Sequence, residues 1–160
     1  MRKYMNEAYQ EALTAYQQGE IPVGAVVTYK GRIIASSGNR VERDQDPTAH
    51  AELLAIKAAA SVLGNWRLNE CDLYVTLEPC IMCLGALINA RIGRLIFGSG
   101  DSLKGGLDLI RYSGKKDLLK NIEVYENIME EECAELLNKF FQERRRTTSD
   151  QRYNKTIRDP

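Results

Sequence analysis

The sequence has a single histidine and no excess of charge of either sign, because 22 Lys and Arg residues balance 22 Asp and Glu residues. A net charge of zero gives no global electrostatic argument for a nucleic-acid partner. No apolar stretch approaches the ~20 residues that span a membrane, and no apolar run typical of a signal peptide follows Met1. These absences predict a soluble, cytoplasmic protein with no membrane partner.

Cysteine is scarce as well, with four residues in the chain. Structural disulfides are not expected in a reducing compartment. Cys71 and Cys133 lie in segments with an apolar pattern and are expected in the core. Cys80 and Cys83 stand three residues apart and are candidate metal ligands. The alternative is a thioredoxin-like redox pair, but that fold's local context is missing and a histidine is available as a further ligand.

Two short segments bring these residue types to the predicted starts of helices. Pro47 precedes an alanine- and leucine-rich run that begins near His50, and Pro79 suits a first helical position, where its missing N–H costs nothing. Cys80 and Cys83 therefore share one face of a first helical turn. The partial positive charge of a helix N-terminus favours thiolates there.

One imidazole and two thiolates, from His50, Cys80 and Cys83, form a ligand set that zinc accepts. Three side chains leave a fourth position for water, whose pKa a catalytic zinc lowers toward about 7. Glu52 stands two residues beyond His50 on another helix face, so it is poorly placed as a fourth ligand and suited to carrying protons. The alternative is a structural zinc with four protein ligands, which would make the chain a binding module.

The rest of the chain alternates predicted strands and helices. Strands are expected at 21–29, 32–36, 71–76, 94–98 and 122–125, and helices at 4–18 and 127–146, with a short helix possible at 107–112. Two further helices are expected to start at His50 and Cys80 and to end near Gly64 and at 89–91. An initial hairpin followed by strand–helix crossovers predicts an α/β fold with a central mixed five-stranded sheet in a three-layer α/β/α sandwich. Residues 1–146 are expected to form one domain, and 147–160 a polar, flexible tail.

The order His50-x-Glu52 followed by Pro79-Cys80-x-x-Cys83 matches the signature of zinc-dependent nucleobase deaminases. Over most of residues 5–146 the chain resembles the bacterial tRNA-specific adenosine deaminases of the cytidine deaminase superfamily. The segments that carry this resemblance are 47–52, 66–68, 73–83, 90–92, 131–133 and 140–141. The resemblance implies a cytidine deaminase-like fold and conversion of the wobble adenosine, position 34 of a tRNA, to inosine with release of ammonia.

The same resemblance implies roles for particular residues and for partners. His50, Cys80 and Cys83 would hold one Zn²⁺ per subunit, and Glu52 would move protons between the attacking water, the base and the leaving amine. Asn39 would hydrogen-bond the base, although it could instead be a turn residue. The tRNA anticodon stem-loop is the implied partner, and the chain is expected to form a homodimer with its site near the subunit interface.

Three further substrate contacts are implied by the resemblance. Asp101 would lie beside the bound RNA, and Arg144, in an arginine run that could also be only solvated, would meet the nucleic acid. Neighbouring positions on a helix point apart, so one of Phe140 and Phe141 is expected in the core and the other, assigned to Phe141, is expected to stack on a base.

The segment 99–121 departs from the family pattern. It lacks a Gly-Ser and a later Asn-His pair, and 101–106 is one residue longer. Because this loop contacts the anticodon stem-loop in the family, the departure bears on substrate choice and leaves the metal ligands intact. The alternative substrate is a free base, nucleoside or nucleotide of the guanine, cytosine or adenine type.

Overall fold

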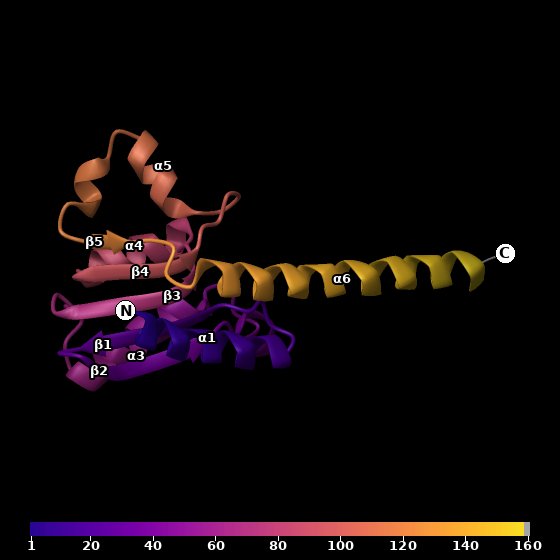
Figure 1. Ribbon diagram of the computed structural model, residues 1–160, viewed down its shortest axis with the longest axis horizontal. Helices are drawn as coiled ribbons and strands as arrows, with labels where there is room; N and C mark the ends of the chain where they lie inside the picture. The colour runs from indigo at the N-terminus through magenta and orange to yellow at the C-terminus, as the bar shows by residue number, and fades with distance from the viewer. Residues whose placement is uncertain (159–160) are drawn as a thin grey trace.

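The protein is a five-stranded sheet with helices on both faces (Figure 1). The computed structural model describes the backbone of residues 1–158 and the side chains of residues 1–115 and 117–146. The strands are β1 Gly24–Tyr29, β2 Arg32–Gly38, β3 Cys71–Leu77, β4 Arg94–Ser99 and β5 Glu123–Tyr125. The helices are α1 Arg2–Gln17, α2 Val41–Asp44, α3 Ala51–Leu63, α4 Ile81–Ala90, α5 Gly106–Tyr112, the 3₁₀ helix η1 Lys116–Leu119 and α6 Glu130–Arg158.

The sheet is mixed, as the sequence predicts. Its strand order is β2-β1-β3-β4-β5, with β1 antiparallel to both of its neighbours and with β3, β4 and β5 parallel. The hairpin of β1 and β2 supplies the antiparallel part, and the crossovers through α4 and α5 supply the parallel part. The predicted three-layer α/β/α sandwich is therefore confirmed.

Alternate residues along the central strands bury opposite faces of the sheet. The face covered by α3, α4 and α5 carries Ala25, Val27, Leu73, Val75, Leu95 and Phe97. The face covered by α1 and α6 carries Val26, Tyr74 and Ile96. Because both faces are buried, these strands read as nearly continuous apolar runs in the sequence.

Helix α6 is longer than the sequence analysis expects. It begins at Glu130 and extends to Arg158, so the predicted helix end at Arg146 is wrong and residues 147–158 continue the helix. No glycine or proline, the usual stop signals, occurs between 130 and 158. Figure 1 shows the helix projecting beyond the sheet and the other helices. The division into a domain and a tail stays a prediction.

Among the residues that the structure describes, no helix has the length and apolar character needed to cross a membrane. Helix α6, the longest, is rich in charged residues along its whole length.

We expect Gly24→Ala to destabilise the fold by about 3 kcal/mol, because overpacking against a rigid neighbour is costly. A Cβ at Gly24 would lie 2.0 Å from the Ala8 carbonyl oxygen and 2.5 Å from the Ala12 backbone nitrogen, both in α1. The matched control is Gly85→Ala in α4, where a Cβ meets nothing within 4 Å, and where alanine favours a helix by up to about 1 kcal/mol. Urea denaturation of both variants measures the difference, and equal stabilities would contradict the packing argument.

Candidate metal centre and its surroundings

Two helix starts bring three metal-binding side chains together. His50 is the residue immediately before α3 and Cys80 the residue immediately before α4, and both have extended backbone dihedrals. Cys83 lies in the first turn of α4 and is fully buried. Because α3 and α4 pack on the same face of the sheet, their N-termini meet where β3 ends.

The three ligand atoms form a triangle of the size that a tetrahedral metal requires. The Sγ atoms of Cys80 and Cys83 are 3.6 Å apart, and His50 Nδ1 lies 3.7 Å from Cys80 Sγ and 3.5 Å from Cys83 Sγ. Zinc bonds of about 2.3 Å to sulfur and about 2.0 Å to nitrogen give tetrahedral edges of about 3.8 Å between sulfurs and about 3.6 Å between sulfur and nitrogen. The residues present therefore fit such an ion.

The part of the chain that the structure describes adds no fourth ligand to this cluster. Glu52, in the first turn of α3, lies beside it and is only 4% exposed. Burial raises the pKa of the Glu52 carboxyl, and a hydrogen bond that the Cys83 thiol donates to it acts in the opposite direction. A carboxyl of this kind exchanges a proton close to neutral pH more readily than an exposed one.

The electrostatics of His50 also suit a metal ligand. Burial lowers the pKa of the imidazole, and the positive charge of Lys104 lowers it further. The neutral ring is the form that binds metals.

Burial raises the pKa of the Cys83 thiol. A coordinated cation would lower the pKa of this thiol, because a thiol that binds a metal is deprotonated.

Asn39 lies just after β2 and is 6% exposed. Its Nδ2 donates a hydrogen bond to Oε2 of the buried Glu20 at 3.2 Å. The next residue, Arg40, donates its backbone N–H to the carbonyl of Ala49, directly before His50. Asn39 is thus a buried residue in a specific contact, one position along the chain from a backbone link to the segment that carries His50. Its predicted role in binding the base stays a prediction.

Asp101 is tied to the same centre through Glu78. The Glu78 carboxylate accepts hydrogen bonds from the backbone N–H groups of Asp101 and Leu107, each at 3.1 Å. The Gly106 N–H donates to the carbonyl of Pro79 at 2.9 Å. The Asp101 carboxylate itself accepts from two backbone N–H groups further along its own loop. The loop after β4 is therefore fixed against the segment that leads into Cys80.

Phe140 and Phe141 have the different environments expected of neighbours on a helix, because Phe140 is 6% exposed and Phe141 is 41% exposed. Arg144 donates to the carbonyl of Gly19, at the end of α1, and its guanidinium lies over the Phe140 ring. Since Gly19 directly precedes Glu20, this part of α6 lies near the residue that holds Asn39. Contacts of Phe141 and Arg144 with nucleic acid stay predictions.

Three residues that support the site are not among those predicted from the sequence, namely Glu20, Glu78 and Lys104. Glu78 could have been noticed because it directly precedes Pro79 and Cys80. Glu20 gives no local signal, because its side-chain partners lie nineteen or more positions further along the chain. Lys104 lies in the segment 99–121 that departs from the family pattern.

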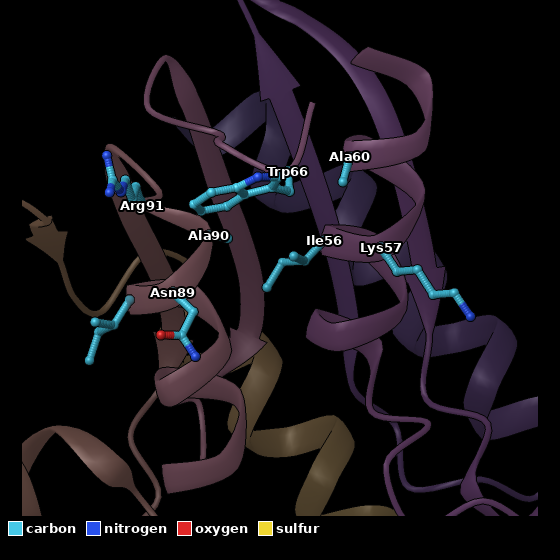
Figure 2. Close-up of a pocket in the computed structure, with 8 residues that line it drawn as sticks. Ile56, Lys57, Ala60, Trp66, Asn89, Ala90 and Arg91 are labelled. Atoms are coloured by element: carbon cyan, nitrogen blue, oxygen red, sulfur yellow. The ribbon is translucent and has the colours of Figure 1, made fainter. Parts of the chain in front are cut away.

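A groove of about 580 Å³ lies between α3 and α4, away from the metal cluster. Figure 2 shows Ile56 and Ala60 from α3 and Ala90 from α4 facing it, with Trp66 across its top. The indole of Trp66 is 53% exposed and lies 4.2 Å from the guanidinium carbon of Arg67. The groove is therefore apolar at its floor and basic at its rim.

Comparison with known proteins gives consistent matches over nearly the whole chain. The model of the MafB19-like deaminase family matches residues 1–145. A tRNA-specific adenosine deaminase from Bacillus subtilis is 42% identical over 153 residues, which cover 94% of each chain. A solved structure from studies of A-to-I editing by tRNA:A34 deaminases has a TM-score of 0.81 at 42% identity and covers 86% of this chain and all of that one.

A guanine deaminase structure from Bacillus subtilis is also similar, at 41% identity and a TM-score of 0.59. It covers 61% of this chain and 63% of that chain. The similarity to the tRNA deaminases covers 86–94% of this chain and therefore extends further than the similarity to this guanine deaminase.

We expect Glu78→Gln to loosen the loop after β4, because the amide side chain can accept from only one of the two backbone N–H groups. Losing a hydrogen bond to a charged acceptor costs about 1.5–3 kcal/mol, so exchange of the Asp101 or Leu107 amide proton should speed up about 10- to 100-fold. Hydrogen exchange followed by NMR measures this. Glu126→Gln, which breaks an ion pair with Arg111, is the control; unchanged exchange in Glu78→Gln would contradict the assignment.

Proposed function

The chain belongs to the tRNA-specific adenosine deaminases, and from this premise we propose that it hydrolytically deaminates the wobble adenosine at position 34 of a tRNA to inosine, releasing ammonia. The observation that carries this proposal is the triangle of His50, Cys80 and Cys83 with the buried Glu52 beside it. The similarity to the tRNA deaminases supports the choice of substrate, because it covers all of these residues.

We propose that the metal is Zn²⁺, one ion per subunit, held by His50, Cys80 and Cys83. The distances among the three ligand atoms support this choice. When bound, zinc supplies Lewis-acid activation that lowers the pKa of water toward about 7.

Glu52 carries the proton transfers in this proposal. The carboxylate takes one proton from the attacking water and delivers it to a ring nitrogen of adenine, and it then assists protonation of the leaving amine. The oxygen of water forms a bond to the carbon that bears the amine, the carbon–nitrogen bond breaks, and ammonia leaves. The burial of Glu52 supports this role, because burial raises the pKa of a carboxyl toward the operating pH.

The adenosine must leave the anticodon loop and enter the site as an extruded base. We assign Asn39 to a hydrogen bond with that base, Asp101 to the neighbouring RNA, the exposed Phe141 to stacking and Arg144 to the phosphate backbone. The link from Arg144 through Gly19 to Glu20 and Asn39 supports this grouping. Because tRNA is found in the cytoplasm, this substrate also implies a cytoplasmic location.

We further propose that the chain acts as a homodimer through the α3–α4 groove. Trp66 at the groove and Ile81 at the start of α4 are each at least half exposed, at 53% and 50%. Exposed apolar side chains of this size favour burial against a partner. Ile81 follows the ligand Cys80 directly, so a partner that extends from the groove along α4 to Ile81 would come close to the site.

We expect the protein to form inosine in an RNA anticodon stem-loop with adenosine at position 34, and Glu52→Gln to lower kcat by about 10²- to 10⁴-fold, the usual contribution of a positioned acid or base. Chromatography of nucleosides after digestion measures inosine. Released ammonia is measured in parallel with free guanine, cytosine and adenine. Brisk ammonia release from a free base without inosine in the RNA would refute the tRNA assignment.

Metal analysis separates a catalytic role of Glu52 from loss of the ion. Glu52→Gln should keep one zinc per chain, whereas Cys83→Ser should lose it, because three ligands hold the ion. A chelator should abolish inosine formation and added Zn²⁺ restore it. Full activity of the zinc-free protein would contradict the proposed cofactor.

The dimer proposal predicts that Trp66→Glu lowers the sedimenting mass from that of two chains to that of one, because the variant loses the apolar contact area of the indole and adds a charge that the interface must desolvate. Analytical ultracentrifugation at micromolar protein measures this. Tyr112→Glu on α5, where the tyrosine is 86% exposed, is the control and should leave the mass unchanged. A wild-type protein that sediments as one chain would contradict the proposal.

A further inference from the structure

Glu20 is a buried carboxylate that belongs neither to the metal cluster nor to its proton chemistry. The residue follows the end of α1, where Gly19 adopts a positive φ of +77° and Glu20 donates its backbone N–H to the Ala15 carbonyl. Its side chain points inward and the residue is 1% exposed. Burying a charged carboxylate is costly unless hydrogen bonds satisfy its oxygens.

Three N–H donors satisfy the Glu20 carboxylate. Oε1 accepts from the backbone N–H of Arg43 at 2.7 Å, and Oε2 accepts from the backbone N–H of Glu42 and from Asn39 Nδ2, each at 3.2 Å. No cation pairs with Glu20 in the described part of the chain. The carboxylate therefore holds the first turn of α2 and the Asn39 amide together.

This arrangement fixes which way the Asn39 amide faces. An ionised carboxylate only accepts hydrogen bonds, so the group facing Glu20 must be the NH₂ group. Within the described residues no hydrogen bond reaches Asn39 Oδ1, and no buried side-chain oxygen or nitrogen lacks a partner, so Oδ1 faces accessible space. Asn39 thus keeps one acceptor and one N–H available for a ligand, and its neighbour Arg40 pairs through its backbone with Ala49, the residue before His50.

That pair of groups matches one edge of adenine. Adenine offers the N6 amine as a donor next to N7 as an acceptor, whereas guanine offers two acceptors, O6 and N7, on the same edge. An asparagine held in one orientation accepts from the amine and donates to N7. If the amide could turn over freely, it would lose part of its selectivity for this pattern.

We propose that Glu20 is a positioning residue that orients Asn39 for the base to be deaminated; the inference rests on the proposed function and specifies how that site reads its substrate. Glu20 acts through Asn39 and touches no reacting atom. The alternative is a purely structural role as a remote cap for α2, whose N-cap residue Arg40 makes no side-chain capping bond.

A double-mutant cycle separates the two roles. Glu20→Gln replaces one of the two accepting oxygens with an NH₂ group, so the side chain can no longer satisfy all three donors and should hold the Asn39 amide less firmly in one orientation. We expect Glu20→Gln and Asn39→Ala each to lower kcat/KM on the anticodon stem-loop by about 10- to 100-fold, the scale of a misplaced binding group. In the Asn39→Ala background, Glu20→Gln should lower kcat/KM by less than about a further twofold. If the double variant instead loses the product of the two single-variant factors in kcat/KM, the proposal is overturned in favour of the structural role.

Glu132→Gln is the matched control, because its carboxylate pairs with Arg2 at the surface, away from Asn39. It should change kcat/KM by less than about twofold, as expected for the loss of a surface ion pair. Thermal unfolding of every variant corrects for loss of folded protein.

NMR of the wild-type protein tests the contact without activity. The Asn39 side-chain NH₂ resonances, identified by their loss in Asn39→Ala, should exchange with solvent at least tenfold more slowly than those of an exposed asparagine. Fast exchange would overturn the proposal even if Glu20→Gln fails to fold. Slow exchange in a protein that forms no inosine would support the contact and refute only the proposed function.

Discussion

The site depends on one constraint, namely that α3 and α4 pack on the same face of the sheet and begin at the same edge of it, so that side chains from both helix starts reach one point. The polypeptide leaves β3 and enters α4 within three residues, and α3 packs beside it on the same apolar surface. This geometry brings Nδ1 of His50 within 3.7 Å of both cysteine sulfurs. The apolar core under the helices therefore sets the dimensions of the metal centre.

Three carboxylates around this centre do different work because their surroundings differ. Glu52 is buried beside the ligands, and its raised pKa suits proton transfer. Glu20 is equally buried but is satisfied by three N–H donors. Glu78 accepts from two backbone N–H groups and holds the loop after β4. The three residues are all glutamates, so the differences among them come from their hydrogen bonds and their burial.

The segment 99–121 is attached to the part of the chain that carries the metal ligands. Gly105 pairs with Cys80 as an isolated bridge, and a Cβ at Gly105 would lie 2.4 Å from a Glu78 oxygen. Leu103, at 91%, and Tyr112, at 86%, are exposed in this segment, whereas Leu107 and Ile110 of α5 are buried in the core. The segment 99–121 therefore combines support of the segment that carries Cys80 with exposed apolar side chains at the surface.

The sequence by itself determined the elements and the chemistry, because both are local. Strand and helix periodicity, the helix-start residues around His50 and Cys80, and the spacing of two cysteines all act within a few positions. Only the tertiary structure decided which distant groups support them. Glu20 accepts a hydrogen bond from Asn39, and Glu78 accepts one from the backbone of Asp101, although about twenty residues separate each pair in the sequence. The end of α6 at Arg158 was also missed, since polar composition resembles a tail but contains no residue that stops a helix. Such contacts depend on how the chain packs, which no short window of sequence records.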